Sequence, residues 1–148
     1  MKMTKVNIKK LNDKAVVPTY GSEFSAGADL YACIDEPITI EAGKTVLVHT
    51  GIAMEIPVGY VGLVFARSGL ASKKGLAPAN KVGVIDADYR GEIMVALHNH
   101  SDEARTIEAG ERVAQIALLP FLAADFEVVD DLTDTARGAG GFGSTGRK

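Results

Sequence analysis

Short segments of alternating apolar residues, separated by turn-forming residues, run through most of this chain. Alternation at period two is typical of strands with one buried face, and glycine and proline mark the turns between them. The turn residues recur about every 8–12 residues, which is the spacing of an all-β sandwich or barrel. The apolar segments are 5–11, 38–57, 59–66, 91–99 and 111–121, and the turn residues are Pro37, Gly43, Pro57, Gly59, Gly91 and Gly110.

Turns and breaks are also predicted inside these segments. Within 38–57, Ala42 and Gly43 predict a turn and Gly51 predicts a break or bulge between two strands. Only one stretch predicts a helix, SGLASKK, with Ser68 as its N-cap and Gly75 at its end. We therefore expect an all-β fold with one short helix.

The chain has 148 residues, which favours a single domain. Such a domain buries about 68–70% of its unfolded surface and needs no disulfide to fold. Periodicity is lost from Ala136 onward, where glycine becomes frequent. We predict a domain over residues 1–136 and a flexible glycine-rich arm over residues 137–148.

Composition excludes several classes of partner. The formal net charge of -3 gives no basic footprint for nucleic acid. No apolar run approaches the ~18 residues of a membrane span, and the first residues lack an apolar signal core. The single cysteine, Cys33, cannot form an internal disulfide. We expect it to be a small buried residue, because no His or Asn lies nearby in the sequence to make it a nucleophile. We expect a cytoplasmic protein without nucleic-acid or membrane partners.

The stretch ARSGLA, residues 66–71, has the residue types of an anion-binding site. Ser68 and Gly69 would present free backbone N–H groups at the positive end of the helix dipole. Arg67 adds a planar guanidinium that suits phosphate oxygens. The alternative is an ordinary helix cap beside a surface arginine.

The stretch NKVGVIDADYRGEI, residues 80–93, places carboxylates after an apolar run. The run leads into Asp86, Asp88 and Tyr89, and a glycine begins the return, so we predict a β-hairpin with two carboxylates and a ring at its tip. The alternative is a solvated acidic turn. Asn80 upstream and the aromatic residue at the tip weigh against that alternative.

Two further polar residues interrupt apolar or small surroundings. Asp29 lies among small residues in AGADL, where a carboxylate could approach a hydrated metal, although an ordinary turn aspartate is the alternative. Gln115 is the one polar interruption of the apolar part of ERVAQIALLP. If it is buried it needs a partner, either a nucleotide phosphate or the backbone.

Residues 137–146, RGAGGFGSTG, match the glycine pattern of dinucleotide-binding loops. In that pattern a helix follows the glycines, and here no helix can follow. The P-loop reading also fails, because Arg147 stands where a lysine is needed. What remains is freely rotating backbone with two hydroxyls, a ring and an arginine, which could wrap an anion with an attached base. A disordered tail is the alternative.

Together these stretches are more specific than any one of them. In this order they resemble the five motifs of the homotrimeric deoxyuridine triphosphatases (dUTPases, or dUTP diphosphatases), over residues 26–146. Ala66 departs from the pattern, since many members have proline there, but no ligand is put in doubt. The matching stretches are AGADL (26–30), RSGLA (67–71), GVIDADYRG (83–91), GERVAQ (110–115) and RGAGGFGSTG (137–146).

The resemblance implies a jelly-roll-like, distorted β-barrel and a homotrimer whose active sites are shared between chains. It implies Mg²⁺-assisted hydrolysis of dUTP to dUMP and pyrophosphate, by in-line attack of water at the α-phosphorus. This reaction would keep uracil out of DNA and supply dUMP for thymidylate synthesis. The arm would close over an active site.

The resemblance also implies a role for each residue. Asp86 looks like the carboxylate that activates the water and accepts from the 3′-hydroxyl. Tyr89 looks like the ring that packs on the deoxyribose and leaves no room for a 2′-hydroxyl. Asp29 resembles the aspartate that holds Mg²⁺ through water. The other expected contacts are Asn80 and the backbone of Val84, Ile85 and Met94 with uracil; Arg67, Ser68, Gly69 and Gln115 with the phosphates; and Arg137, Phe142, Gly143, Ser144 and Thr145 in the arm, with Phe142 over the uracil and Arg137 at the γ-phosphate.

Other functions are also open to this sequence. A dCTP deaminase would need a glutamate over cytosine C4; the nearest is Glu92, but the whole GVIDADYRG stretch matches the phosphatase. A regulatory protein could use the same pocket without turnover, although Asp86 and the arm argue against it. A zinc site at His98 and His100 lacks a cysteine or third histidine nearby.

Overall fold

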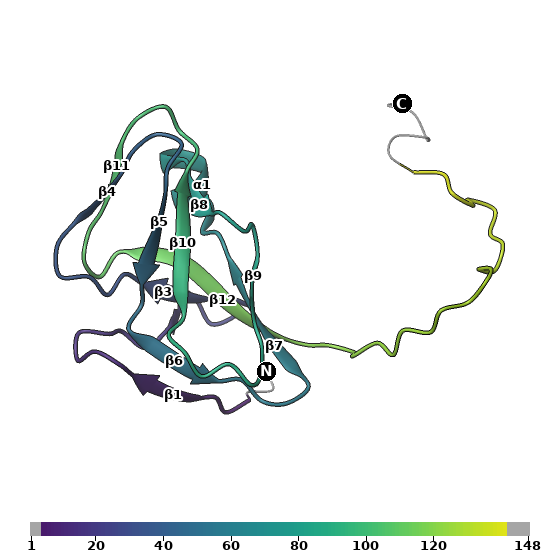
Figure 1. The fold of residues 1–148 in the computed structure, drawn as a ribbon. Helices are drawn as coiled ribbons and strands as arrows, with labels where there is room; N and C mark the ends of the chain where they lie inside the picture. Colours follow the sequence, from purple (N-terminus) through teal and green to yellow (C-terminus); the bar gives the residue numbers. More distant parts are fainter. Residues whose placement is uncertain (1–3, 142–148) are drawn as a thin grey trace.

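The structure is a computed structural model that describes residues 4–141, and this part of the chain contains twelve strands and one short helix (Figure 1). All paired strands are antiparallel. The predicted all-β class with one helix is therefore confirmed. The elements are β1 (Asn7–Lys10), β2 (Thr19–Tyr20), β3 (Ala28–Tyr31), β4 (Ile38–Ile40), β5 (Thr45–His49), β6 (Ile52–Glu55), β7 (Tyr60–Phe65), α1 (Ser68–Lys74), β8 (Leu76–Pro78), β9 (Gly83–Ile85), β10 (Met94–Asn99), β11 (Arg105–Ile107) and β12 (Arg112–Pro120).

The strands form four sheets, with the orders β2-β3-β12-β7-β9, β5-β10-β8, β1-β6 and β11-β4. Most neighbours in a sheet are distant in the chain, so the fold depends on long-range pairing. The long strand β12 lies between β3 and β7 and holds both through its ladders. It therefore brings residues from three separate parts of the chain to one place.

The core is apolar and follows the alternation of the strands. Along β10, Val95, Leu97 and Asn99 are buried while the residues between them are partly exposed. The buried amide of Asn99 donates to the carbonyls of Ile40 at 2.8 Å and Glu103 at 2.7 Å, so its polar atoms have partners. The largest fully buried apolar side chains are Leu30, Ile40, Ile52, Ile56, Leu76, Ile93, Leu97 and Ile107.

The helix α1 ends where the sequence predicts but begins one residue earlier than predicted. Gly75 closes it in the left-handed region with φ 67°, as expected of a C-terminal glycine. Arg67, not Ser68, occupies the N-cap position, and no side chain caps the helix. The prediction for Ser68 is wrong because β7 ends at Phe65, so extended backbone reaches Arg67 and Ser68 already has helical geometry.

The predicted hairpin over residues 80–93 is also wrong. β9 pairs with β7, whereas β10 pairs with β5 and β8. Residues 86–93 therefore cross from the five-stranded sheet to the three-stranded sheet. The local pattern identified both strands and the turn residues, but the partner of each strand is chosen by long-range packing that a short stretch does not contain.

Gly51 separates β5 from β6, as predicted, with φ 68°. A methyl group here would lie 2.8 Å from Ala15 Cβ and 2.8 Å from Cys33 Sγ. We expect Gly51→Ala to lower the free energy of unfolding by about 2–4 kcal/mol, because both the backbone and the packing resist it. Urea unfolding at fixed protein concentration measures the loss.

The matched control is Gly43→Ala. Gly43 lies in the predicted turn with φ 70°, and an added methyl group would meet no atom within 4 Å. Its loss should be about 1–2 kcal/mol, from the backbone alone. Equal losses in the two variants would show that the contacts with Ala15 and Cys33 do not matter.

The chain leaves the strands at Pro120, and residues 121–141 extend away from them (Figure 1). Several apolar side chains of this segment are almost fully exposed, including Leu122 at 98%, Phe126 at 92% and Val128 at 98%. Large apolar side chains left this exposed are candidates for burial against another protein. No helix among the described residues is long and apolar enough to cross a membrane.

Candidate active site

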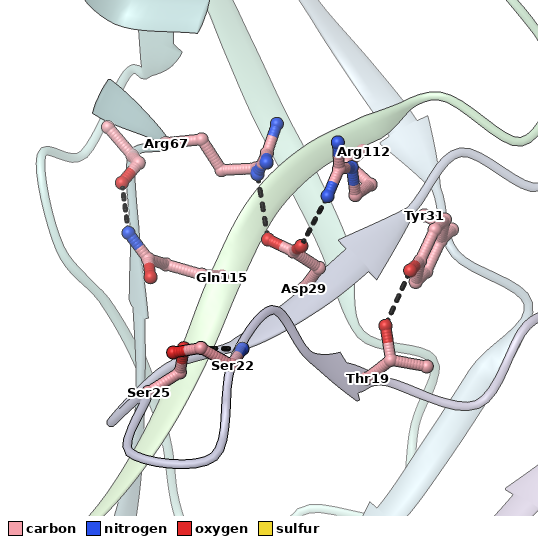
Figure 2. Close-up of polar contacts among 9 residues, drawn as sticks. Thr19, Ser22, Ser25, Asp29, Tyr31, Arg67, Arg112 and Gln115 are labelled. Atoms are coloured by element: carbon pink, nitrogen blue, oxygen red, sulfur yellow. Dashed lines mark hydrogen bonds and ion pairs between the residues drawn. The ribbon is translucent and has the colours of Figure 1, made fainter. Parts of the chain in front are cut away.

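Asp29 on β3 lies with its carboxylate between two arginines (Figure 2). Arg67 Nε donates to Oδ1 at 2.7 Å, and Arg112 Nη1 donates to Oδ2 at 3.2 Å. Asp29 is buried, so this pairing offsets the cost of removing its charge from water. Arg112 is not among the residues predicted from the sequence; its only signal is a cation three residues before Gln115 in the matched stretch.

The strand register explains why these residues meet. Gln115 on β12 lies opposite Asp29 in one ladder and opposite Phe65 in the other, and Arg67 follows Phe65 by two residues. Gln115 Nε2 donates to the carbonyl of Ala66 at 2.9 Å, so its partner within the chain is the backbone. This bond holds the chain just before Arg67. Its contact with a phosphate stays a prediction.

A glycine makes room for this amide. A methyl group on Gly27 would lie 2.4 Å from Gln115 Oε1, closer than atoms can approach. The small residues of AGADL therefore allow β3 and the Gln115 side chain to pack directly together.

The arrangement around Arg67 can bind an anion. Asp29 engages only Nε, and neither Nη group makes a hydrogen bond with another described residue. Ser68 and Gly69 are exposed at the start of α1. A guanidinium held in place on one side, with free donors on the other, suits phosphate oxygens.

A second group of predicted residues lines a cavity of about 210 Å³. The cavity contains the predicted carboxylate, the predicted ring and the backbone positions expected to read a base. Asn80 is not part of its lining. The lining residues are Leu47, Val84, Ile85, Asp86, Tyr89, Glu92 and Met94.

The carboxylate and ring are accessible in this chain. Asp86 is exposed, and Tyr89 is 41% exposed. The position of the Tyr89 ring is fixed, because its hydroxyl donates to the carbonyl of Glu92 at 2.9 Å. The cavity can therefore present a carboxylate beside an ordered aromatic face.

The cavity and the arginine site do not form one pocket in the described part of the chain. The cavity lining contains none of Arg67, Ser68, Gly69 and Gln115. Arg137 is described, and its Nε donates to the carbonyl of Gly140 at 2.7 Å. The other expected contacts of the arm, Phe142, Gly143, Ser144 and Thr145, lie outside the described residues.

The remaining candidates lack reactive geometry. Burial raises the pKa of the Cys33 thiol, which keeps it protonated rather than nucleophilic. The rings of His98 and His100 stack with centroids 6.5 Å apart, and His98 Nδ1 lies 2.9 Å from Thr45 Oγ1. Over residues 4–141 there is no group of three or more His, Cys, Asp or Glu residues that could hold a metal by themselves.

An antiparallel β domain has here an oriented arginine beside a helix start and a separate cavity that offers a carboxylate and a ring, an arrangement that suits a protein that binds a phosphorylated ligand. Comparison with known proteins agrees. The family model described as dUTPase matches residues 13–146. The chain belongs to the dUTPase family, and its jelly-roll-like β fold is that of the family.

Individual relatives support this assignment along nearly the whole chain. The deoxyuridine 5′-triphosphate nucleotidohydrolase of Hahella chejuensis is 46% identical over 147 residues, covering 99% of this chain and 97% of the relative. That of Desulfitobacterium hafniense is 53% identical over 136 residues, covering 90% of each. A solved dUTPase of Staphylococcus bacteriophage 80alpha with dUPNHPP has a TM-score of 0.88 at 28% identity, covering 97% of this chain and 99% of that one. A mutant dUTPase of phage phi11, with a structural Mg(II) ion, has a TM-score of 0.76 at 25% identity and covers 86% of this chain and 98% of that one.

Proposed function

We propose that this chain hydrolyses dUTP to dUMP and pyrophosphate, and so limits the uracil that reaches DNA. The observation that carries the proposal is the single cavity lined by Asp86, Tyr89, Val84, Ile85 and Met94. A uracil ring edge would be read by backbone groups of β9 and β10, while Tyr89 would cover the sugar. Thymine carries an extra methyl group and cytosine a reversed hydrogen-bond pattern, so a rigid cavity can reject both.

Asp86 is the proposed general base. Its carboxylate is exposed and can accept a proton from a bound water. The activated water attacks the α-phosphorus in line with the departing pyrophosphate. Positioning of the triphosphate supplies most of the remaining acceleration.

Arg67, Ser68, Gly69 and Gln115 are the proposed phosphate contacts. The pairing of Arg67 with Asp29 supports this role, because it fixes the guanidinium before a substrate arrives. Gln115 holds the neighbouring carbonyl of Ala66 and so steadies the same turn. A preorganised site loses less free energy on binding than a mobile one.

Mg²⁺ is the proposed cofactor, and the residues fit it through water. Both oxygens of Asp29 accept from arginines, but a carboxylate has about four acceptor positions, so each oxygen can still bind a water. Bound Mg²⁺ would neutralise the charge of the triphosphate. Asp29 would hold the hydrated ion and keep Arg67 in place.

We infer a homotrimer with shared active sites. In a single chain the arginine site and the cavity are separate, so a complete site is better built from two copies. The exposed apolar residues Leu122, Phe126 and Val128 also point to a partner surface. The arm 137–148 would then close over a site. The expected cytoplasmic location rests on composition and stays a prediction.

A substrate panel tests the function. Pyrophosphate release is measured with dUTP, dTTP, dCTP and UTP, with and without Mg²⁺. We expect kcat/KM for dUTP to exceed that for each other nucleotide by about 10- to 100-fold, since each mismatched group of the substrate costs about 1–3 kcal/mol. We also expect the activity to fall without Mg²⁺. Ammonia released from dCTP would instead identify a deaminase, and tight dUTP binding without pyrophosphate release would identify a regulatory protein.

A further inference from the structure

Glu92 lies between two cavities and ties together segments that are distant in the chain. It lines both the 210 Å³ cavity that holds Asp86 and Tyr89 and a cavity of about 450 Å³ on its other side. Its Oε1 accepts from the Gly51 N–H at 2.8 Å, and its Oε2 pairs with His49 Nδ1 at 2.8 Å. The carboxylate therefore fastens the crossing segment 86–93 to the corner between β5 and β6.

The backbone of Glu92 fixes the aromatic ring. Tyr89 Oη donates to the carbonyl of Glu92 at 2.9 Å. A methyl group on Gly91 would lie 2.4 Å from that hydroxyl and 3.0 Å from Cε2, so the ring lies directly over the Gly91 backbone. A shift of residues 91 and 92 would move the ring with them.

The corner that receives Glu92 is itself firmly held. The Ile93 N–H donates to the carbonyl of Ile52 at 2.9 Å, and Thr50 Oγ1 donates to the carbonyl of Ile93. Ile52 and Ile93 are fully buried. Arg90 donates to the carbonyls of Ala87 and Tyr89 within the segment, and its Nη2 makes a longer contact of 3.5 Å with Glu55 Oε1 on β6.

The charge state of Glu92 suits this role. Burial disfavours the ionised form, but the hydrogen bonds from His49 and the Gly51 N–H outweigh it, so the pKa of Glu92 lies below its usual value. At neutral pH both oxygens are therefore acceptors. The other titratable groups that line the 450 Å³ cavity together with Glu92 are Cys33, Asp35, Glu36 and His49.

We propose that Glu92 is a positioning residue for sugar selectivity: its bond to the Gly51 N–H places its own carbonyl, which places the Tyr89 ring against the 2′-carbon of the substrate. This inference rests on the proposed function of the cavity. Its substrate consequence is discrimination between dUTP and UTP, because a ring displaced by a fraction of an ångström leaves room for a 2′-hydroxyl. In this role the Glu92 carboxylate acts through its bonds to His49 and the Gly51 N–H.

Two variants of Glu92 distinguish the effect of side-chain length from the effect of charge. Glu92→Asp keeps the charge but shortens the side chain, so the carboxylate cannot bridge to both Gly51 and His49. Glu92→Gln keeps the length and an acceptor for Gly51 but removes the charge. We expect Glu92→Asp to lower the dUTP-to-UTP ratio of kcat/KM by at least about tenfold, since small misplacements at an active site are costly, and Glu92→Gln to keep most of the ratio.

A double-mutant cycle distinguishes positioning from a general loss of stability. Tyr89→Phe removes the hydroxyl that binds the Glu92 carbonyl. In that background Glu92→Asp should have little further effect on the ratio, because the link is already broken. Additive effects, an unchanged ratio in Glu92→Asp, or an equal loss in Glu92→Gln would each overturn the proposal.

The control is Glu36→Asp. Glu36 lines the larger cavity, is exposed, and makes no side-chain hydrogen bond with another described residue, so its variant should keep the wild-type ratio. Circular dichroism and melting temperature establish that each variant is folded. Wild-type protein that fails to cleave dUTP would count against the proposed function. A wild-type enzyme whose selectivity survives Glu92→Asp would count against Glu92 alone.

Discussion

Asp86→Asn is expected to lower kcat for dUTP by about 10²–10⁴-fold, which is the usual contribution of a general base. Asparagine has nearly the same shape as aspartate and can still bond the 3′-hydroxyl, but it cannot take a proton from water. Affinity for the non-hydrolysable analogue dUpNHpp should therefore change little. Pyrophosphate release gives kcat, and calorimetric titration with the analogue gives the affinity.

Asp88→Asn is the matched control for this prediction. Asp88 is an exposed carboxylate two residues further along; it shares with Asp86 a neighbouring cavity of about 750 Å³ but does not line the 210 Å³ cavity that contains Tyr89. The same loss of charge there should leave kcat close to the wild-type value. Turnover of Asp86→Asn within about threefold of wild type would contradict the assignment of the base, because a lost base costs far more.

The sequence predicted those parts of the fold that depend on local chemistry. Alternation identified the strands, Gly43 marked a turn and Gly51 a break between two strands, both with positive φ, and Gly75 ended the helix. Strand pairing was not predictable in the same way. Because β9 and β10 pair with β7 and β5 rather than with each other, the hairpin was wrong although both strands exist.

The candidate site shows the same difference between what local sequence predicts and what strand pairing decides. Asp86 and Tyr89 are three residues apart in the stretch GVIDADYRG and both line the 210 Å³ cavity, because neighbours in one loop stay close whatever strands flank it. Arg112 was missed because its partner, Asp29, is brought to it only by the ladder between β3 and β12. Glu92 was considered only as a deaminase residue, because its bond to Gly51 joins two segments that no local pattern connects.

Deleting residues 137–148 is expected to lower kcat/KM for dUTP by about 10- to 100-fold while the fold survives. The lost contacts include the proposed bond from Arg137 to the γ-phosphate, and a hydrogen bond to a charged group contributes about 1.5–3 kcal/mol. The twelve strands all end by Pro120, and the described bonds of Arg137 and Gly138 are local ones, to Gly140 and Thr135. The melting temperature should therefore stay near the wild-type value.

A shorter truncation provides the control. Removing only Arg147 and Lys148 leaves every proposed arm contact in place, so its kinetics should match the wild type. If the long truncation also behaved as wild type, the arm would have no part in the reaction. Arg137→Ala, with the rest of the arm intact, should show part of the loss.

Mixing two impaired chains tests whether the arm crosses between subunits. One chain carries Asp86→Asn with an intact arm, and the other lacks residues 137–148 but keeps Asp86. The separation of the arginine site from the cavity, and the extension of residues 121–141 away from the strands, favour crossing. Co-refolded mixtures should then exceed the summed activities of the two parents, because an arm from the first chain can close over a cavity of the second. An arm that covers its own chain's cavity predicts no gain, since no chain in the mixture has both parts.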